Sequence, residues 1–297
     1  MAERNGNTQF KDSVFIRYLT ESDERLVEIY NAVEGTTYPL DTPIRKNTLT
    51  DVLYKDRIND ISFTLDGRTL VLFEHQSTVN ENMPLRLLSY VTRLYEKEVR
   101  TNQDVSIYQR KRIPLPAPKF VVLYNGKESL PEHSTWKLSE SYMSEQENPA
   151  LELNVEVYNI NYSETSELLQ KSPYLNDYSY FVYQVQEAQK VGKTISEAIR
   201  TAADICIAEG KMEDFLREHG MEVEKMLITE WDWDECLDAE RKDARAEGRA
   251  EGQIEEREAL IRKFSQKLSP DEIAETLQMS KAYVLQVLQD ASHTVQP

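Results

Sequence analysis

Residues 58–76 read INDISFTLDGRTLVLFEHQ, and the fold that we expect for the chain rests on this segment. Two runs rich in β-branched and apolar residues, 58–64 and 69–76, flank a short segment that contains Asp66 and Gly67. Such runs on either side of an Asp-Gly pair are typical of a β-hairpin. The sequence therefore predicts two antiparallel strands at the centre of a sheet.

The length of the turn decides which side chains share a face of this hairpin. Successive side chains of a strand point to opposite faces, so Asp60 and Glu74 share a face only if paired residue numbers have an even sum. A three-residue loop that ends at Gly67 meets this condition, because it pairs Thr64 with Arg68 and leaves Asp60 diagonal to Glu74. A two-residue loop gives odd sums and separates the two acids. The longer loop needs a left-handed residue at its third position, and glycine stands there.

Asp60, Glu74 and Gln76 are the residues that we expect to carry the chemistry. Glu74 and Gln76 lie two apart on one strand and therefore point to the same face. Mg²⁺ and Mn²⁺ prefer oxygen ligands, commonly one or two carboxylates together with waters and a substrate phosphate. The main-chain carbonyl of His75 is a further candidate ligand, whereas the His75 ring points to the opposite face and is expected to pack. Polar Ser62 continues the expected polar face beside Asp60.

Several charged residues outside the hairpin are candidates for contacts with substrate. Arg86, Tyr90 and Arg93 fall at positions i, i+4 and i+7 of the next predicted helix, so they form a stripe that contacts phosphate or is simply solvated. Asp12 is a possible extra acid of the site, although an N-cap or surface role is the commoner use of such a residue. The basic residues 110–112 either contact DNA or belong to a solvated loop.

The remaining pattern predicts a mixed α/β fold. A helical pattern over residues 11–33 has a break near Ser22, and another helix follows the hairpin. Residues 119–124 form a continuous apolar run, typical of a strand buried on both faces, and 151–160 form a further strand. From 162 to 230 the pattern is helical, which gives strands and helices in a mixed order followed by helices alone.

Composition excludes several classes of protein. The 297 residues carry a net charge of −17, but 17 of the 35 basic and 17 of the 52 acidic residues lie in residues 1–120, so the excess lies entirely after them. The first part can therefore still contact phosphate. No apolar run long enough to cross a membrane and no apolar signal segment is present, so we expect a cytoplasmic protein with no membrane partner. Glycine-rich phosphate loops and Cys/His zinc spacing are also missing, and we expect no organic cofactor.

Four segments together resemble a known family. They read NDISF at 59–63, LFEHQST at 72–78, NMPLR at 82–86 and FVVLYNG at 120–126. They are similar to the Rpn family of recombination-promoting nucleases and transposase-like proteins, and the Glu-His-Gln-Ser segment is the most specific. The resemblance implies a PD-(D/E)XK core, a mixed central sheet flanked by helices, with divalent-metal cleavage of DNA and a link to recombination or mobile elements.

The resemblance assigns roles to individual residues. Asp60 and Glu74 match the metal-binding acids of the family, with Mg²⁺ or Mn²⁺ as the implied cofactor. Gln76 stands where the wider superfamily usually has lysine. An amide orients water or phosphate, but it cannot neutralise developing negative charge as an ammonium group does.

We expect four parts along the chain. Residues 1–165 form the nuclease-like domain, 166–230 a helical extension beside it, 231–265 a charged helical linker and 266–297 a small helical hairpin. Ser269 begins this hairpin with a capping box. The acidity of the hairpin favours dimerisation or regulation over DNA binding.

Three functions are compatible with these patterns. The first is a Mg²⁺-dependent endodeoxyribonuclease that binds DNA and acts as a homodimer, because a two-fold dimer most simply cuts both strands. The second is an inactive nuclease-fold protein that acts through protein interaction, for example in a defence or mobile-element system. The third is a helical adaptor in which Asp60, Glu74 and Gln76 do not converge.

Overall fold

The computed structural model describes residues 14–47, 60–101, 106–228, 256–265 and 267–293. The contacts between residues divide the chain into two compact units, one that ends at Trp231 and one that starts at Asp232. We describe each unit by itself. No helix among the described residues is both long and apolar enough to cross a membrane.

The first unit opens with two short helices, α1 (Val14–Thr20) and α2 (Asp23–Glu34). Ser22 separates them as the N-cap of α2, where its side chain accepts a hydrogen bond from the Arg25 N–H. Gly35 ends α2 in the left-handed conformation, with φ of 66°. The predicted break near Ser22 is therefore confirmed.

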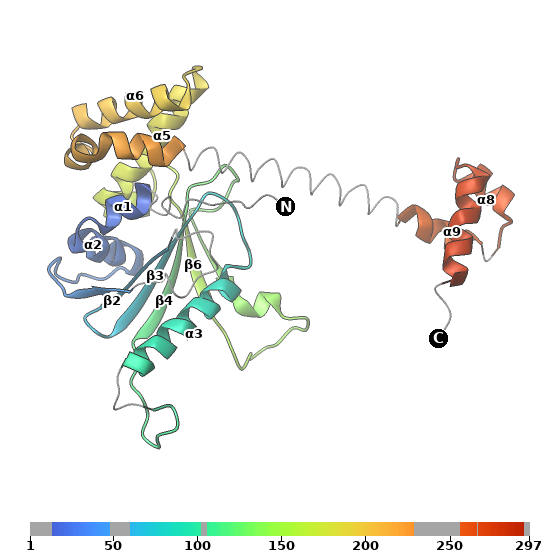
Figure 1. Cartoon of the computed structure of the whole chain (residues 1–297), viewed down its shortest axis with the longest axis horizontal. Coiled ribbons are helices and arrows are strands. Elements are labelled where there is room, and N and C mark those ends of the chain that lie inside the picture. Colours follow the sequence, from blue (N-terminus) through green and yellow to red (C-terminus); the bar gives the residue numbers. More distant parts are fainter. Residues whose placement is uncertain (1–13, 48–59, 102–105, 229–255, 266, 294–297) are drawn as a thin grey trace, which may run out of the picture. The chain divides into compact units, whose positions relative to one another are not determined.

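A mixed six-stranded sheet lies at the centre of this unit (Figure 1). Its strands, in chain order, are β1 (Ile44–Lys46), β2 (Asp60–Leu65), β3 (Thr69–Gln76), β4 (Ala117–Tyr124), β5 (His133–Lys137) and β6 (Asn154–Asn159). In space the order is β1-β2-β3-β4-β6-β5. The hairpin strands β2 and β3 are antiparallel, whereas β3, β4 and β6 run parallel. The predicted mixed α/β class is thus confirmed.

The two edge strands were not predicted from the sequence. β1 has only three residues, too few for an alternating pattern. In β5 half-buried and exposed positions alternate and no residue is fully buried, because the strand pairs with β6 alone at the sheet edge. Edge strands carry a weaker apolar signal than central ones, and this explains why both were missed.

The hairpin register has the predicted parity but is shifted by two residues. Leu65 pairs with Thr69, so Asp60 stands directly opposite Glu74 rather than diagonal to it. Paired numbers still have an even sum, which keeps positions 60 and 74 on one face. The shift arises because Leu65, at 1% exposure, remains in the strand and pairs with Ile44 of β1.

The turn itself is residues 66–68, one residue later than predicted. Asp66 and Gly67 both have positive φ, 48° and 65°, and the Arg68 N–H donates to the Leu65 carbonyl at 3.0 Å. Two positive φ values in succession are the requirement of a type I′ turn. The left-handed glycine expected at position 67 is therefore present.

The two faces of the sheet are covered by different helices (Figure 1). The helix α3 (Met83–Thr101) packs on one face over Leu70, Leu72 and Val122. The other face carries α1, α2, α4 (Glu167–Lys171), α5 (Pro173–Lys190), α6 (Ile195–Ala208) and a helical segment over 213–228. Alternation along β3 therefore puts Glu74 and Gln76 on the face covered by α3.

The second unit is a small helical cluster. A helical segment over 256–264 is followed by α8 (Pro270–Thr276) and α9 (Lys281–His293). The predicted capping box is present, because Ser269 and Glu272 bond reciprocally at the start of α8. The buried core of this unit consists of Ile261, Ile273, Val284 and Val287. Most of the predicted linker 231–265 lies outside the described residues.

Candidate active site

Glu74 is a buried carboxylate near the end of β3. Its exposed fraction is 3%, and its Oε1 accepts a hydrogen bond from Arg86 Nη2 at 2.9 Å. β3 brings Glu74 to this place because apolar residues bury the strand on both faces up to Phe73. A buried carboxylate is tolerated only when a charged or hydrogen-bonding partner compensates it, and Arg86 is that partner.

Arg86 projects from the first turns of α3 towards the sheet. Its Nη2 also donates to the Tyr90 hydroxyl at 3.1 Å, one turn further along the helix. The Arg86 side chain is 35% exposed, whereas Tyr90 is 8% exposed. Residues at i and i+4 are neighbours on a helix, which explains why Tyr90 holds the guanidinium from the side. The guanidinium therefore extends from the buried carboxylate to the surface.

Gln76 completes this group from the same face of β3. Its amide oxygen accepts from Arg86 Nη1 at 3.2 Å, and its amide nitrogen donates to the Thr78 carbonyl at 3.2 Å. The opposite orientation brings the amide nitrogen within 3.4 Å of Glu74 Oε1 but turns it towards the guanidinium, which has donors only. We therefore prefer the first orientation. The positive charge beside Glu74 comes from α3, because Gln76 provides none.

The second oxygen of Glu74 tests whether this place fits a metal. Oε2 is buried and accepts no hydrogen bond from any described residue. A buried charged oxygen without a partner costs free energy, and coordination of a cation removes that cost. The backbone of Asp60 stands directly opposite Glu74, which places a second acidic residue on the neighbouring strand. The side chain of Asp60 lies outside what the structure describes. The donor set fits a divalent ion that prefers oxygen.

Ser62 and Thr64, which follow Asp60 on the same face, have a partner that was not foreseen. Both are 4% exposed. Asn47, just after β1, donates from its side-chain amide to Ser62 Oγ at 3.2 Å and to Thr64 Oγ1 at 3.4 Å. The polar face of β2 is thus satisfied within the protein along these two residues. Only the stretch nearer to Glu74 is left for a ligand.

His75 lies on the opposite face of β3, as its place between Glu74 and Gln76 requires. Its ring stacks on Phe15 with 4.2 Å between centroids, and its Nε2 is 3.3 Å from the Tyr178 hydroxyl. Burial lowers the pKa of His75 to about 3, so the ring is neutral. The ring cannot reach Glu74 and Gln76 on the α3 face of the sheet, so the main-chain carbonyl is the part of His75 that remains a candidate metal ligand.

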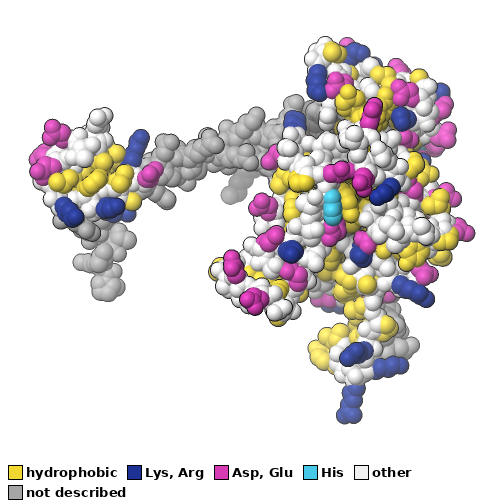
Figure 2. Space-filling model, turned by 180° about the vertical axis from the view of Figure 1, so that it is seen from behind, with side chains coloured by type: hydrophobic (Ala, Val, Ile, Leu, Met, Phe, Trp, Pro, Cys, Tyr) yellow, Lys and Arg dark blue, Asp and Glu magenta, His cyan; other side chains and the backbone are white. Residues whose placement is uncertain are grey.

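The other predicted contacts lie further from Glu74. Arg93 is half-buried, nearly one turn beyond Tyr90 on α3. The exposed basic residues 110–112 follow the far end of α3, a helix of 19 residues that is about 28 Å long. Figure 2 shows Lys and Arg side chains on this protruding loop, whereas acidic and basic side chains intermix over the rest of the larger unit. Asp12 lies outside the described residues.

Gly126 has a role beyond the turn chemistry expected of Asn-Gly. A Cβ at this position would lie 1.9 Å from the Ser77 carbonyl oxygen and 2.5 Å from the Tyr124 hydroxyl. The Asn125 N–H also donates to the Gln76 carbonyl at 3.0 Å. The loop after β4 therefore packs directly on the backbone that follows Gln76, and only glycine permits this approach. The pair Asn125-Gly126 was the available sequence signal.

Comparison with known proteins gives one match. The model of the family described as "Putative transposase, YhgA-like" matches residues 38–193. No curated protein and no solved structure matches. The matched region includes the hairpin, α3 and β4, and hence all the contacts of Glu74 described above. It spans a little over half of the 297 residues, in agreement with the resemblance to the Rpn family. The chain belongs to the family of YhgA-like putative transposases.

Proposed function

We propose that Glu74 is the centre of a metal-dependent nuclease site that hydrolyses phosphodiester bonds of DNA on a PD-(D/E)XK core. One observation carries the proposal. A carboxylate that is 3% exposed has one oxygen bonded to Arg86 and the other without a partner among the described residues. Membership of a transposase family points in the same direction, towards a function linked to mobile elements.

Asp60, Glu74 and the main-chain carbonyl of His75 would hold Mg²⁺ or Mn²⁺. When bound, such an ion polarises the phosphodiester and lowers the pKa of a coordinated water. Glu74 is suited to this role because Arg86 fixes Oε1 and leaves Oε2 free to coordinate. Holding one oxygen in place reduces the freedom that the side chain loses on binding.

Arg86 takes the role that lysine has in the wider superfamily. Its guanidinium is always charged and lies between Glu74 and Gln76, although it comes from α3 rather than from the strand. With its side chain 35% exposed, it can also present N–H groups to a phosphate oxygen. Gln76 then orients the guanidinium through its amide oxygen. Tyr90, 8% exposed, holds the guanidinium in place, and the half-buried Arg93 on the same helix would contact the bound DNA further along.

The test is cleavage of supercoiled plasmid in Mg²⁺ or Mn²⁺ by the full chain. We expect Asp60→Asn and Glu74→Gln to abolish cleavage while far-UV circular dichroism stays unchanged. Glu81→Gln, which changes an exposed acid in the loop after β3, is the matched control and should cut normally. Cleavage by Glu74→Gln at the wild-type rate would refute the proposal.

The alternative is a nuclease fold that acts through protein interaction. It is favoured by the neutral Gln76 and by the ion pair that already compensates Glu74. It predicts no cleavage and no Mg²⁺ or Mn²⁺ binding by calorimetry. The helical adaptor is less well supported, because Glu74 and Gln76 converge on Arg86.

The nuclease proposal includes a two-fold dimer of the chain. Sedimentation equilibrium, which measures the mass of the protein in solution, tests this part of the proposal.

A further inference from the structure

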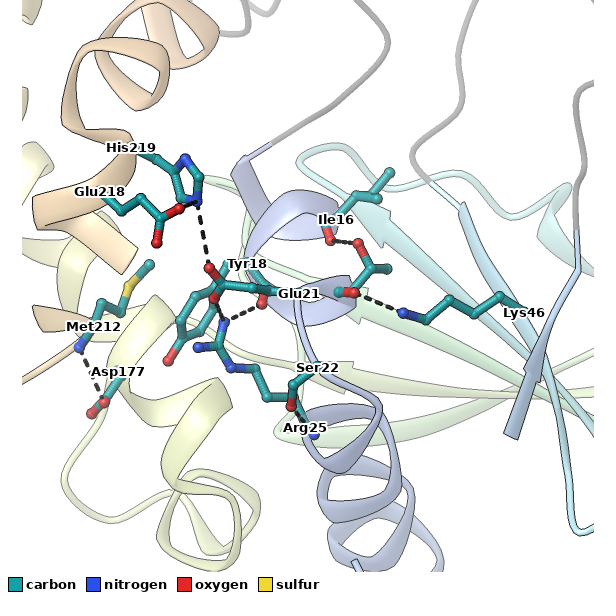
Figure 3. A network of polar contacts seen from close by, with 11 residues as sticks. Ile16, Tyr18, Glu21, Ser22, Arg25, Lys46, Asp177, Met212, Glu218 and His219 are labelled. Atoms are coloured by element: carbon teal, nitrogen blue, oxygen red, sulfur yellow. Dashed lines mark hydrogen bonds and ion pairs between the residues drawn. The ribbon is translucent and has the colours of Figure 1, made fainter. Parts of the chain in front are cut away.

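A second group of metal-ligating side chains lies away from the sheet, where the helical segment 213–228 meets the turn between α1 and α2 (Figure 3). His219 Nε2 is 3.4 Å from Glu21 Oε1 and 3.9 Å from Glu218 Oε1. These three atoms all lie within 4.8 Å of one another. The ring is largely buried, with a side-chain exposure of 15%, and packs on Phe215.

The spacing of these atoms is close to that of a coordination shell. Two ligands of a tetrahedral metal, each about 2.1 Å from it, lie about 3.4 Å apart. Nε2 and Glu21 Oε1 already have this separation, whereas Glu218 Oε1, at 3.9 Å from Nε2, has to move closer to complete the shell. Glu218 has a side-chain exposure of 74%, so it is free to make that shift.

The surrounding charges orient the ligands. His219 Nδ1 is 3.7 Å from Glu222 Oε2, and Arg17 holds the same oxygen at 3.4 Å. Arg25 binds the other oxygen of Glu21, Oε2, at 2.5 Å. Metal-binding histidines usually direct the second ring nitrogen to a carboxylate, which fixes the tautomer and turns the free lone pair to the metal. Glu222 offers such a carboxylate at 3.7 Å from Nδ1, and a small shift of its exposed side chain brings it within hydrogen-bond distance.

A cation between the three atoms would compensate the two carboxylates that face His219. In the tautomer that carries its proton on Nδ1, Nε2 offers a lone pair to a metal, as do the carboxylate oxygens of Glu21 and Glu218 that face it. Three acceptors pointed at one another repel, unless a proton or a metal ion lies between them. Arg17 and Arg25 do not fill this place, because each binds an oxygen outside the group of three.

We propose that Glu21, Glu218 and His219 bind a divalent transition metal such as Zn²⁺, with water in the remaining position. One imidazole and two carboxylates are a ligand set that Zn²⁺ accepts. The metal would fasten the segment 213–228 to the α1–α2 turn. The site shares no residue with the one at Glu74, so it does not depend on the proposed nuclease function.

Calorimetric titration of the full chain with Zn²⁺ at pH 7 tests this proposal. We expect His219→Gln to weaken the tightest Zn²⁺ site at least ten-fold, and Glu222→Gln to weaken it by about ten-fold through the orientation of the ring. His133→Gln is the matched control, because His133 faces a single carboxylate, that of Glu156. It should leave Zn²⁺ binding unchanged.

Two further variants test whether a loss of Zn²⁺ binding is due to the loss of a ligand rather than to misfolding, and whether it is independent of the site at Glu74. Glu218→Gln changes a largely exposed side chain, so it should weaken Zn²⁺ binding without lowering the melting temperature of the metal-free protein. Glu74→Gln should keep the tight Zn²⁺ site, even if it abolishes DNA cleavage. Equal Zn²⁺ affinity of wild type and Glu218→Gln would overturn the proposal. So would an equal loss of affinity in His133→Gln and His219→Gln, which would indicate unspecific binding to surface histidines.

Discussion

Removing Arg86 should cost far more stability than removing the charge of Glu74, although the two residues form one ion pair. In Arg86→Met, the Glu74 side chain stays at 3% exposure and its Oε1 loses the guanidinium that compensates it. Loss of one partner of a buried pair costs about 3–5 kcal/mol, and the 35% exposure of Arg86 places our expectation at about 3 kcal/mol. In Glu74→Gln the guanidinium keeps its bonds to Tyr90 and Gln76 and stays 35% exposed, so we expect a cost of about 1 kcal/mol.

Urea unfolding of the two single variants and of the double variant Arg86→Met/Glu74→Gln measures this difference. The double variant removes both charges, so it should be more stable than Arg86→Met alone, with a coupling of about 1–3 kcal/mol. Equal costs of the two single substitutions, or strictly additive costs in the double variant, would refute our account of a buried carboxylate that depends on a half-exposed guanidinium.

Three further predictions concern single residues of the larger unit. Gly126→Ala should destabilise the protein by about 1–3 kcal/mol in thermal unfolding, because the new Cβ meets the Ser77 carbonyl oxygen at 1.9 Å, whereas Gly220→Ala, with open space around it, should be neutral or stabilising. Wild type should lose stability as pH falls below about 6.5, since the pKa of His75 is about 3 in the folded state and the unfolded chain takes up the proton first. The loss should be at most about 1.4 kcal/mol per pH unit, and urea titrations of His75→Phe at pH 7 and pH 5 should show a smaller change. Burial raises the pKa of the Cys206 thiol to about 12, so peptide mapping should find it unmodified by iodoacetamide in the native protein and modified after unfolding.

Much of the local structure followed from short-range patterns. The break at Ser22, the hairpin and the buried strand β4 were predicted, because caps, Asp-Gly turns and continuous apolar runs act over a few residues. The exact register was not, because it depends on Leu65, which β1 and the core hold in the strand. β1 itself is separated from β2 by many residues, and its three residues carry no pattern of their own.

The residues of the candidate site also divide into those that the sequence indicates and those whose contacts only the structure shows. The stripe of Arg86 and Tyr90 is visible in the sequence, which leaves open whether it contacts phosphate or is simply solvated. In the structure Arg86 is committed first to Glu74. Asn47 and Gly126 were missed as partners of this region, since each acts through a contact that only the packed sheet creates.

Which residues of β3 share a face follows from the sequence alone. Side chains alternate strictly along a strand, so Glu74 and Gln76 had to lie together and the His75 ring had to lie behind them. Tertiary structure decided what each of these residues meets. Arg86 reaches Glu74 only because α3 crosses that face of the sheet, and His219 reaches Glu21 only because the segment 213–228 packs on the α1–α2 turn. Such contacts depend on how whole elements pack, and the periodicity of one element carries no information about its neighbour.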